Sequence, residues 1–159
     1  MGSIKTNALR ILEQRNIDFE MIQYENRDMK IDGQSVAEKI GQDHQIVFKT
    51  LVTTSGNNTI YVFVIPVDSE LDLKKAAKVS GEKKIEMLVM KDLQKFTGYI
   101  RGGCSPVGMK KQYRTYINDS AGNHEKIIVS AGKVGVQMKL KVEDLLETVN
   151  GHLADVIKR

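Results

Sequence analysis

The pattern of apolar and polar positions predicts short helices and strands in the first third of the chain. Apolar residues at helical spacing predict an amphipathic helix over residues 5–16. Alternating apolar and polar residues then predict a strand over residues 17–24. A capping box that begins at Ser35, followed by a stop at Gly41, predicts a short helix between them.

A β-hairpin is the clearest prediction in the middle of the chain. Residues 46–54 and 59–65 are rich in β-branched and apolar side chains, and Ser55-Gly56-Asn57-Asn58 lies between them as a turn. The shorter elements predicted to follow are a helix over 71–79, a strand over 85–89, a helical turn over 92–96 and a strand end at 99–101.

The last third of the chain again combines strands with helices. It predicts a strand over 113–117, a turn over 118–123, strands over 127–130 and 135–140 around a glycine corner at Ala131-Gly132-Lys133, and helices over 142–149 and 153–157. The order lacks a regular βαβ rhythm, and hairpins imply antiparallel pairing. The predicted fold class is therefore α+β, with a curved, mostly antiparallel (mixed) β-sheet and helices packed around it.

The composition is that of an ordinary globular domain. The chain has 159 residues, 41% hydrophobic and 28% charged, so we expect one domain over residues 1–159. No apolar run reaches the roughly 20 residues of a membrane span, and the N-terminus lacks the apolar segment of a signal peptide. One cysteine excludes an intrachain disulfide and fits a cytoplasmic location, and with three dispersed histidines it makes no zinc ligand set.

The charge permits a nucleic-acid partner without requiring one. The formal net charge is +4, and several lysines are grouped. Two interpretations of these groups stay open, a solvated surface or a phosphate-binding face. The groups are Lys74, Lys75 and Lys78, then Lys83 and Lys84, then Lys110 and Lys111.

One glycine-rich loop, Gly102-Gly103-Cys104-Ser105-Pro106-Val107-Gly108, is the most distinctive local feature. Three glycines in seven residues allow backbone conformations that a Cβ would forbid, which suggests that backbone N–H groups face a ligand. A phosphate-binding P-loop is excluded because Met109 stands where its lysine belongs. A nucleophile elbow is excluded because Val107 stands where its second glycine belongs. Cys104 is either a small packed residue or a thiol nucleophile without an assigned histidine.

A lysine interrupts the first strand of the predicted hairpin. Strand alternation places Lys49 on the same face as Val47 and Leu51. Its side chain either extends along that face to solvent or points into a cleft, where its ammonium would bind an anion or a carbonyl oxygen.

Four separated motifs carry a resemblance to a known family. In chain order they are Phe48-Lys49-Thr50-Leu51, Leu73-Lys74-Lys75-Ala76-Ala77-Lys78, the segment from Thr97 through the glycine loop to Gly108, and Val129-Ser130-Ala131-Gly132-Lys133. Together they resemble the YbaK/EbsC family of aminoacyl-tRNA deacylases, which is similar to editing domains of some prolyl-tRNA synthetases. The resemblance covers nearly the whole chain.

The resemblance implies a free-standing editing enzyme that removes cysteine from mischarged Cys-tRNA(Pro). It implies no metal and no cofactor, tRNA as a partner and prolyl-tRNA synthetase as a second one. It implies catalytic roles for Lys49 and Gly102. The substrate-binding positions that it implies are Tyr24, Thr50, Gly103, Ser105, Pro106, Gly108, Ser130 and Gly132.

The chain departs from the family pattern at several positions. Many members have an aliphatic residue where Cys104 stands and a second glycine where Ala131 stands, and some have an acidic residue where Gln137 stands. The last difference leaves open a deacylase with another aminoacyl preference.

The residues suggest no protein nucleophile with a base, and the family offers attack by the substrate's own thiol on its ester. Two other hypotheses stay open, a non-catalytic module that binds tRNA or a synthetase, and a thiol enzyme that uses Cys104.

Overall fold

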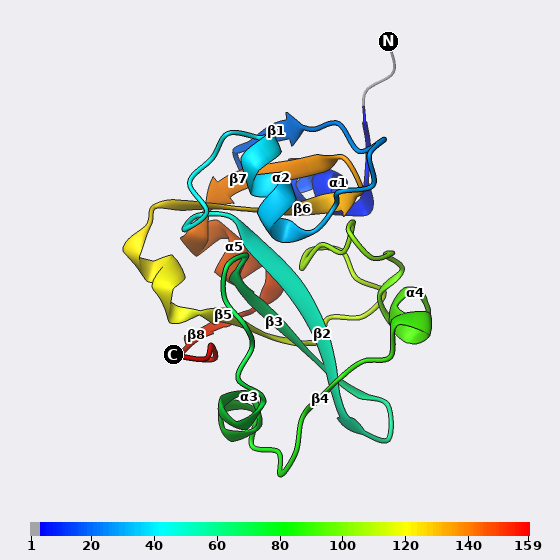
Figure 1. Ribbon diagram of the computed structural model, residues 1–159, viewed down its shortest axis with the longest axis vertical. Helices are drawn as coiled ribbons and strands as arrows, with labels where there is room; N and C mark the ends of the chain where they lie inside the picture. The colour runs from blue at the N-terminus through cyan, green and yellow to red at the C-terminus, as the bar shows by residue number, and fades with distance from the viewer. Residues whose placement is uncertain (1–3) are drawn as a thin grey trace.

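A computed structural model describes residues 4–159 of the chain (Figure 1). Its α-helices are α1 (Asn7–Gln14), α2 (Gly33–Lys39), α3 (Leu73–Ser80), α4 (Leu93–Thr97) and α5 (Val142–Val149). Its strands are β1 (Phe19–Gln23), β2 (Phe48–Gly56), β3 (Thr59–Pro66), β4 (Glu86–Met87), β5 (Arg114–Asn118), β6 (Lys126–Lys133), β7 (Val136–Lys141) and β8 (His152–Ala154). Two 3₁₀ helices, η1 (Met90–Asp92) and η2 (Asp119–Asn123), lie between them.

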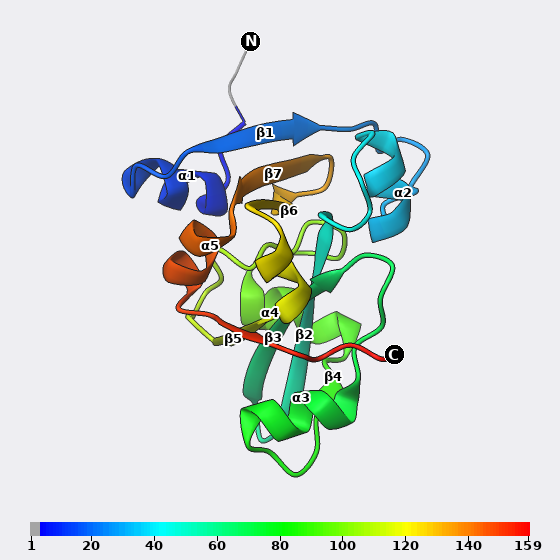
Figure 2. The same ribbon diagram turned by 90° about the vertical axis from the view of Figure 1, so that its left-hand side faces the viewer.

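The strands form two sheets. Three strands pair antiparallel in the order β1-β7-β6, and five pair in the order β4-β2-β3-β5-β8, with parallel pairing at β3–β5 and β5–β8. Figures 1 and 2 both show the smaller sheet at one end of the molecule, above the long β2–β3 hairpin. The α+β class with mixed, mostly antiparallel pairing is therefore confirmed.

The main core joins the two sheets. It packs Leu9 and Leu12 of α1 and Leu145 of α5 against Val64 of β3 and Met138 of β7. Tyr61, Phe63 and Ile65 alternate with Val62 and Val64 along β3, so they face a second cluster that α3 covers. β3 is therefore buried on both faces, which explains its nearly continuous apolar sequence.

Local capping signals account for several helix boundaries. The Asp72 carboxylate accepts hydrogen bonds from the first-turn amides of α3, and Gly81 ends this helix at φ +76°. The predicted start of α2 was wrong by three residues, because Asp32 rather than Ser35 caps it. The Asp32 carboxylate accepts from both the amide and the hydroxyl of Ser35.

Three other predicted elements were wrong. Residues 153–157 form no helix, because His152–Ala154 pair in parallel with β5. Residues 99–101 form no strand, and the Gly103 amide instead closes a turn on the Ile100 carbonyl (3.0 Å). The predicted corner at residues 131–133 lies inside β6, which continues to Lys133 through an irregularity in its register with β7.

Candidate active site

A pocket of about 240 Å³ lies along one edge of β2. Its other walls come from the segment that enters α2, from β4 with the residues that follow it, and from the start of the glycine-rich loop. In Figure 1 this loop, in yellow-green after α4, runs beside β2 and below β6. The pocket therefore gathers segments that are far apart in the sequence.

The edge of β2 is open where it forms the pocket wall. β3 pairs with β2 along its whole length, whereas β4 pairs on the other side only at Thr53 and Thr54. The Val52 carbonyl accepts from the Leu88 amide there. Between this contact and the bridge from Val47 to β6, no strand of residues 4–159 pairs with this edge. Backbone groups of this stretch are thus available to a ligand in the pocket.

Lys49 lies on this stretch of β2 and lines the pocket. The position agrees with the cleft interpretation of its side chain. Burial lowers the pKa of Lys49 below its ordinary value, and the carboxylates of Glu70 and Asp68 oppose that effect. The ammonium is therefore partly desolvated, which strengthens its interaction with an anionic or carbonyl oxygen nearby.

Thr50 and Ser130 also line the pocket. The Thr50 hydroxyl is buried and has no hydrogen-bond partner among residues 4–159, although most buried polar groups in proteins are paired. The Ser130 hydroxyl accepts a hydrogen bond from the Gly132 amide (3.2 Å). The hydroxyl of Tyr24 is likewise buried without a partner in the described part of the chain, but Tyr24 lies outside the pocket lining.

Gly102 is the glycine of the glycine-rich loop that lines the pocket. Its φ is +83°, and a Cβ at this position would lie 2.7 Å from Cδ1 of Ile31. A side chain at Gly102 would therefore be strained and would displace the residue opposite it.

The other predicted glycines are packing positions and do not line the pocket. A Cβ on Gly103 would lie 2.9 Å from the Val134 amide nitrogen. A Cβ on Gly108 or Gly132 would lie 2.8 or 2.9 Å from the Tyr99 side chain. These three glycines thus let the loop and β6 close around Tyr99 and the turn after β6.

Ser105 and Pro106 are buried residues of the loop itself and lie outside the pocket lining. The Ser105 hydroxyl accepts from the Val107 amide (3.2 Å), and the Tyr99 hydroxyl donates to the Val107 carbonyl (2.6 Å). Both contacts fix the loop from within.

Cys104 lines the pocket but is poorly suited to act as a nucleophile. Burial raises the pKa of its thiol to about 12, so the thiol is protonated near neutral pH. The only carboxylate in the lining, Asp32, is engaged in capping α2, and its hydrogen bonds with Ser35 lower its pKa. The lining thus contains no raised carboxyl pKa that would mark a general base.

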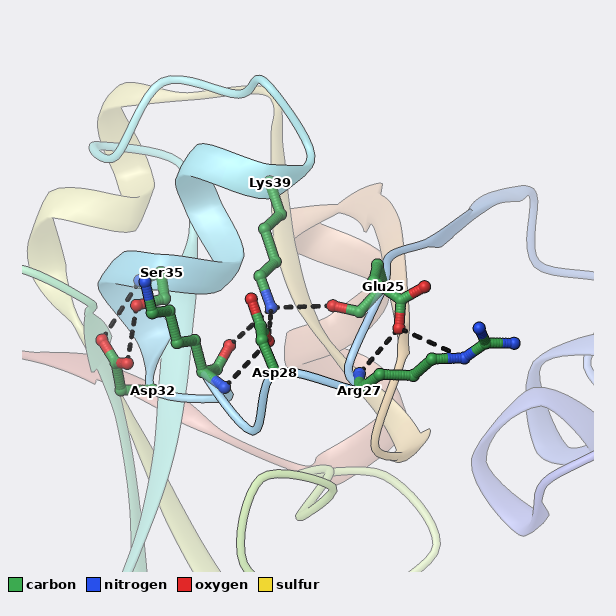
Figure 3. Close-up of polar contacts among 7 residues, drawn as sticks. Glu25, Arg27, Asp28, Asp32, Ser35 and Lys39 are labelled. Carbon is green, nitrogen blue, oxygen red and sulfur yellow. Dashed lines mark hydrogen bonds and ion pairs between the residues drawn. The ribbon is translucent and has the colours of Figure 1, made fainter.

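The loop over residues 25–32, between β1 and α2, where the sequence predicts no element and no site residue, supplies a wall of the pocket. The Lys39 ammonium binds the Glu25 carbonyl (2.7 Å), the Asp28 carboxylate (2.7 Å) and the Lys30 carbonyl (2.9 Å), as Figure 3 shows. These three contacts hold the loop in the conformation that places Ile31 against Gly102.

Sequence reasoning also missed several pocket residues near β4 and next to the glycine loop: Met87, Leu88, Met90, Leu93 and Arg101. The signal for Arg101 was its place directly before Gly102. The apolar residues could have been noticed because three of them occur in the short run Met87–Met90.

The arrangement offers charge, hydrogen bonds and an apolar wall without an acid–base pair. Such a site suits a small polar group, such as an ester, whose reaction depends on positioning and on stabilisation of an oxyanion. Among residues 4–159, no three His, Cys, Asp or Glu side chains meet in a metal-ligand group. No helix in the same residues has the length and apolarity that crossing a membrane requires.

Comparisons with known proteins agree with this geometry. Residues 32–148 match the family model of the aminoacyl-tRNA editing domain. A protein of Enterococcus faecalis, named EbsC as a candidate Cys-tRNA(Pro)/Cys-tRNA(Cys) deacylase, is 48% identical over 152 residues, which cover 96% of this chain and 93% of that protein.

Two solved structures share the fold. One, a candidate trans-editing enzyme for prolyl-tRNA synthetase, superposes with a TM-score of 0.84 at 20% identity, covering 99% of this chain and 100% of that chain. The other, a hypothetical protein, superposes with a TM-score of 0.87 at 18% identity, covering 96% and 100%.

Proposed function

The chain belongs to the aminoacyl-tRNA editing domain family, and we propose that it is a free-standing deacylase that removes cysteine from mischarged Cys-tRNA(Pro). The observation that carries the proposal is the convergence of Lys49, Thr50 and Gly102 on one small pocket. The name of the Enterococcus faecalis relative supports cysteine as the aminoacyl group.

Lys49 and the start of the glycine loop are assigned the role of holding the ester. The Gly103 amide is already bonded to the Ile100 carbonyl, and Pro106 has no amide hydrogen. The amides of Gly102 and Cys104 have no such backbone partner within residues 4–159, so they are loop donors that remain beside the pocket. Losing one such donor typically reduces a rate by roughly 10²–10³.

The proposed chemistry uses the thiol of the substrate. Its sulfur attacks the ester carbonyl carbon, the bond from that carbon to the ribose oxygen breaks, and the thiol proton is transferred to the ribose oxygen. The products are a cyclic thioester and the free tRNA. The protein then contributes positioning, which can lower a barrier by about 7–11 kcal/mol.

The test is deacylation of tRNA(Pro) charged with cysteine, serine, alanine or proline by the purified protein. We expect rapid loss of cysteine only, and loss of that activity in Lys49→Met. Equal clearance of cysteine and serine would overturn the thiol step. Clearance of none of the four would overturn a deacylase for Cys-tRNA(Pro).

A second candidate function is a deacylase with another aminoacyl preference. Gln137 is buried, lines the pocket and pairs across the strands with Ser130, so this wall presents a neutral amide. The same charged-tRNA panel, extended to other amino acids, separates the two candidates. Action beside prolyl-tRNA synthetase, a cytoplasmic location and a single domain over residues 1–159 belong to the proposal as well.

A further inference from the structure

The run of residues from the end of β4 to Met90 exposes large apolar side chains beside the pocket. Met87, Val89 and Met90 are 46%, 57% and 56% exposed, and two of them, Met87 and Met90, also line the pocket. Leu88 between them is only partly exposed and packs with the cluster around Tyr99. Exposed apolar side chains gathered at a pocket mouth are typical of a binding surface.

Basic side chains without carboxylate partners accompany this apolar run. Arg101 is exposed, lines the same pocket and forms no ion pair among residues 4–159. Lys91 directly follows Met90 and is likewise exposed and free of ion pairs in the described chain. The nearby carboxylate of Glu86 is engaged by Lys84 (2.8 Å). We call Met87, Val89, Met90, Lys91 and Arg101 together the rim.

We propose that the rim docks the unpaired nucleotides at the 3′ end of tRNA, with base faces on the apolar side chains and phosphates at Arg101 and Lys91. The inference rests on the proposed function. An aminoacyl ester held in the pocket leaves its ribose at the mouth, so the terminal nucleotides must cross the surface outside. Single-stranded nucleotides present flat apolar faces and anionic phosphates, and the rim complements both.

Lys75 of α3 does not extend this surface. Lys75 is held by the Asp155 carboxylate (3.1 Å) and the Ile157 carbonyl (2.8 Å) at the C-terminal segment. Figures 1 and 2 both place α3 at the far end of the β2–β3 hairpin from α2, whose entry forms a pocket wall. The rim is a positively charged surface that adjoins the pocket, because Arg101 lines the pocket and Lys91 follows Met90, which also lines it.

The experiment measures binding of an uncharged RNA minihelix that ends in CCA, compared with the same RNA carrying abasic residues at its last two positions. We expect the wild type to bind the intact RNA about 5-fold more tightly, since the intact bases bring apolar faces that the abasic RNA lacks. The double variant Met87→Ser/Met90→Ser should lose this preference. Met21→Ser is the matched control, because Met21 is 40% exposed on β1 and outside the pocket lining.

Arg101→Gln tests the phosphate contact. It should weaken binding of both RNAs several-fold and reduce the slope of log affinity against log salt by about 0.7, as expected for one single-strand phosphate contact. Arg10→Gln, at an exposed position of α1, is the matched control.

Equal affinity of the wild type for intact and abasic RNA would overturn the inference. So would loss of synthetase binding in the methionine double variant with RNA binding unchanged, because the rim would then be a protein interface. The charged-tRNA assay tests the proposed function separately, since binding of uncharged RNA requires no catalysis.

Discussion

Ile31 lies directly over Gly102, so closely that a Cβ on the glycine would be 2.7 Å from the Ile31 methyl carbon Cδ1. The contact joins the loop before α2 to the glycine-rich loop across the pocket mouth. Any change at Gly102 therefore acts on both walls at once.

Gly102→Ala should lower deacylation at least 10-fold and destabilise the fold by about 1 kcal/mol, since alanine is strained at φ +83° and meets Ile31. Rates and urea unfolding measure the two effects. Gly41→Ala is the control, because φ is +66° there and nothing lies within 4 Å of its Cβ position. It should show the stability loss alone. Adding Ile31→Ala should restore part of the Gly102→Ala rate, and an unchanged rate would contradict the steric explanation.

Lys49→Met should reduce the deacylation rate by roughly 10²–10³, because it removes the positive charge beside the ester. It should not lower stability, because it also removes an ammonium that burial partly desolvates. Single-turnover rates and thermal unfolding measure these changes. Lys126→Met, at an exposed position of β6, should leave the rate unchanged. A loss of stability that parallels the loss of rate would instead indicate a structural role for Lys49.

The lowered pKa of Lys49 also predicts how stability depends on pH. Between the lowered pKa in the fold and the ordinary value of 10.5, the unfolded chain binds more protons at this lysine than the folded chain does. Stability contributed by this group therefore rises with pH in that window. We expect the stability of the wild type relative to Lys49→Met to increase as pH approaches 10.5. A flat difference in urea unfolding between pH 8 and 10.5 would contradict the shift.

Cys104→Ala should keep the deacylation rate within about 2-fold of the wild type and destabilise the fold by about 1 kcal/mol, as loss of a small buried group does. Because burial raises the pKa of this thiol to about 12, the wild type should also react slowly with a disulfide reagent at neutral pH. Rapid labelling accompanied by loss of activity would restore the thiol-enzyme hypothesis.

Tyr24→Phe and Thr50→Val should each increase stability by about 1 kcal/mol, because they remove buried hydroxyls that lack partners among residues 4–159. Tyr113→Phe is the opposite control, since its hydroxyl donates to the Phe96 carbonyl (2.6 Å) and its loss should cost about 1 kcal/mol. Deacylation should fall in Thr50→Val, because we propose that the Thr50 hydroxyl binds the substrate. Full activity of that variant would remove Thr50 from the binding site.

Short-range patterns predicted many elements of the fold. α5 occupies the predicted residues 142–149, and the predicted hairpin turn lies at Asn57 and Asn58, both at positive φ. The C-terminal strand β8 could not be predicted this way, because only its pairing with β5, more than 30 residues earlier, holds residues 152–154 extended.

The site was predictable only where a local sequence pattern marks a residue. Lys49 was identified because a lysine inside an apolar strand is unusual. The packing of Gly108 and Gly132 depends on where Tyr99 lies, and the position of Ile31 depends on the contacts of Lys39 with the loop before α2. Neither relationship leaves a periodic trace in the sequence.

The packing of Gly108 and Gly132 around Tyr99 has a consequence for how this motif is interpreted across relatives. Selection against misfolding and selection for catalysis would both keep these glycines unchanged, so their persistence in a lineage would be ambiguous. A saturation mutagenesis library scored separately for abundance and for deacylation would resolve the two pressures. Variants with substitutions at Gly103, Gly108 or Gly132 should be depleted in the abundance screen. Variants with substitutions at Gly102 should be depleted chiefly in the activity screen.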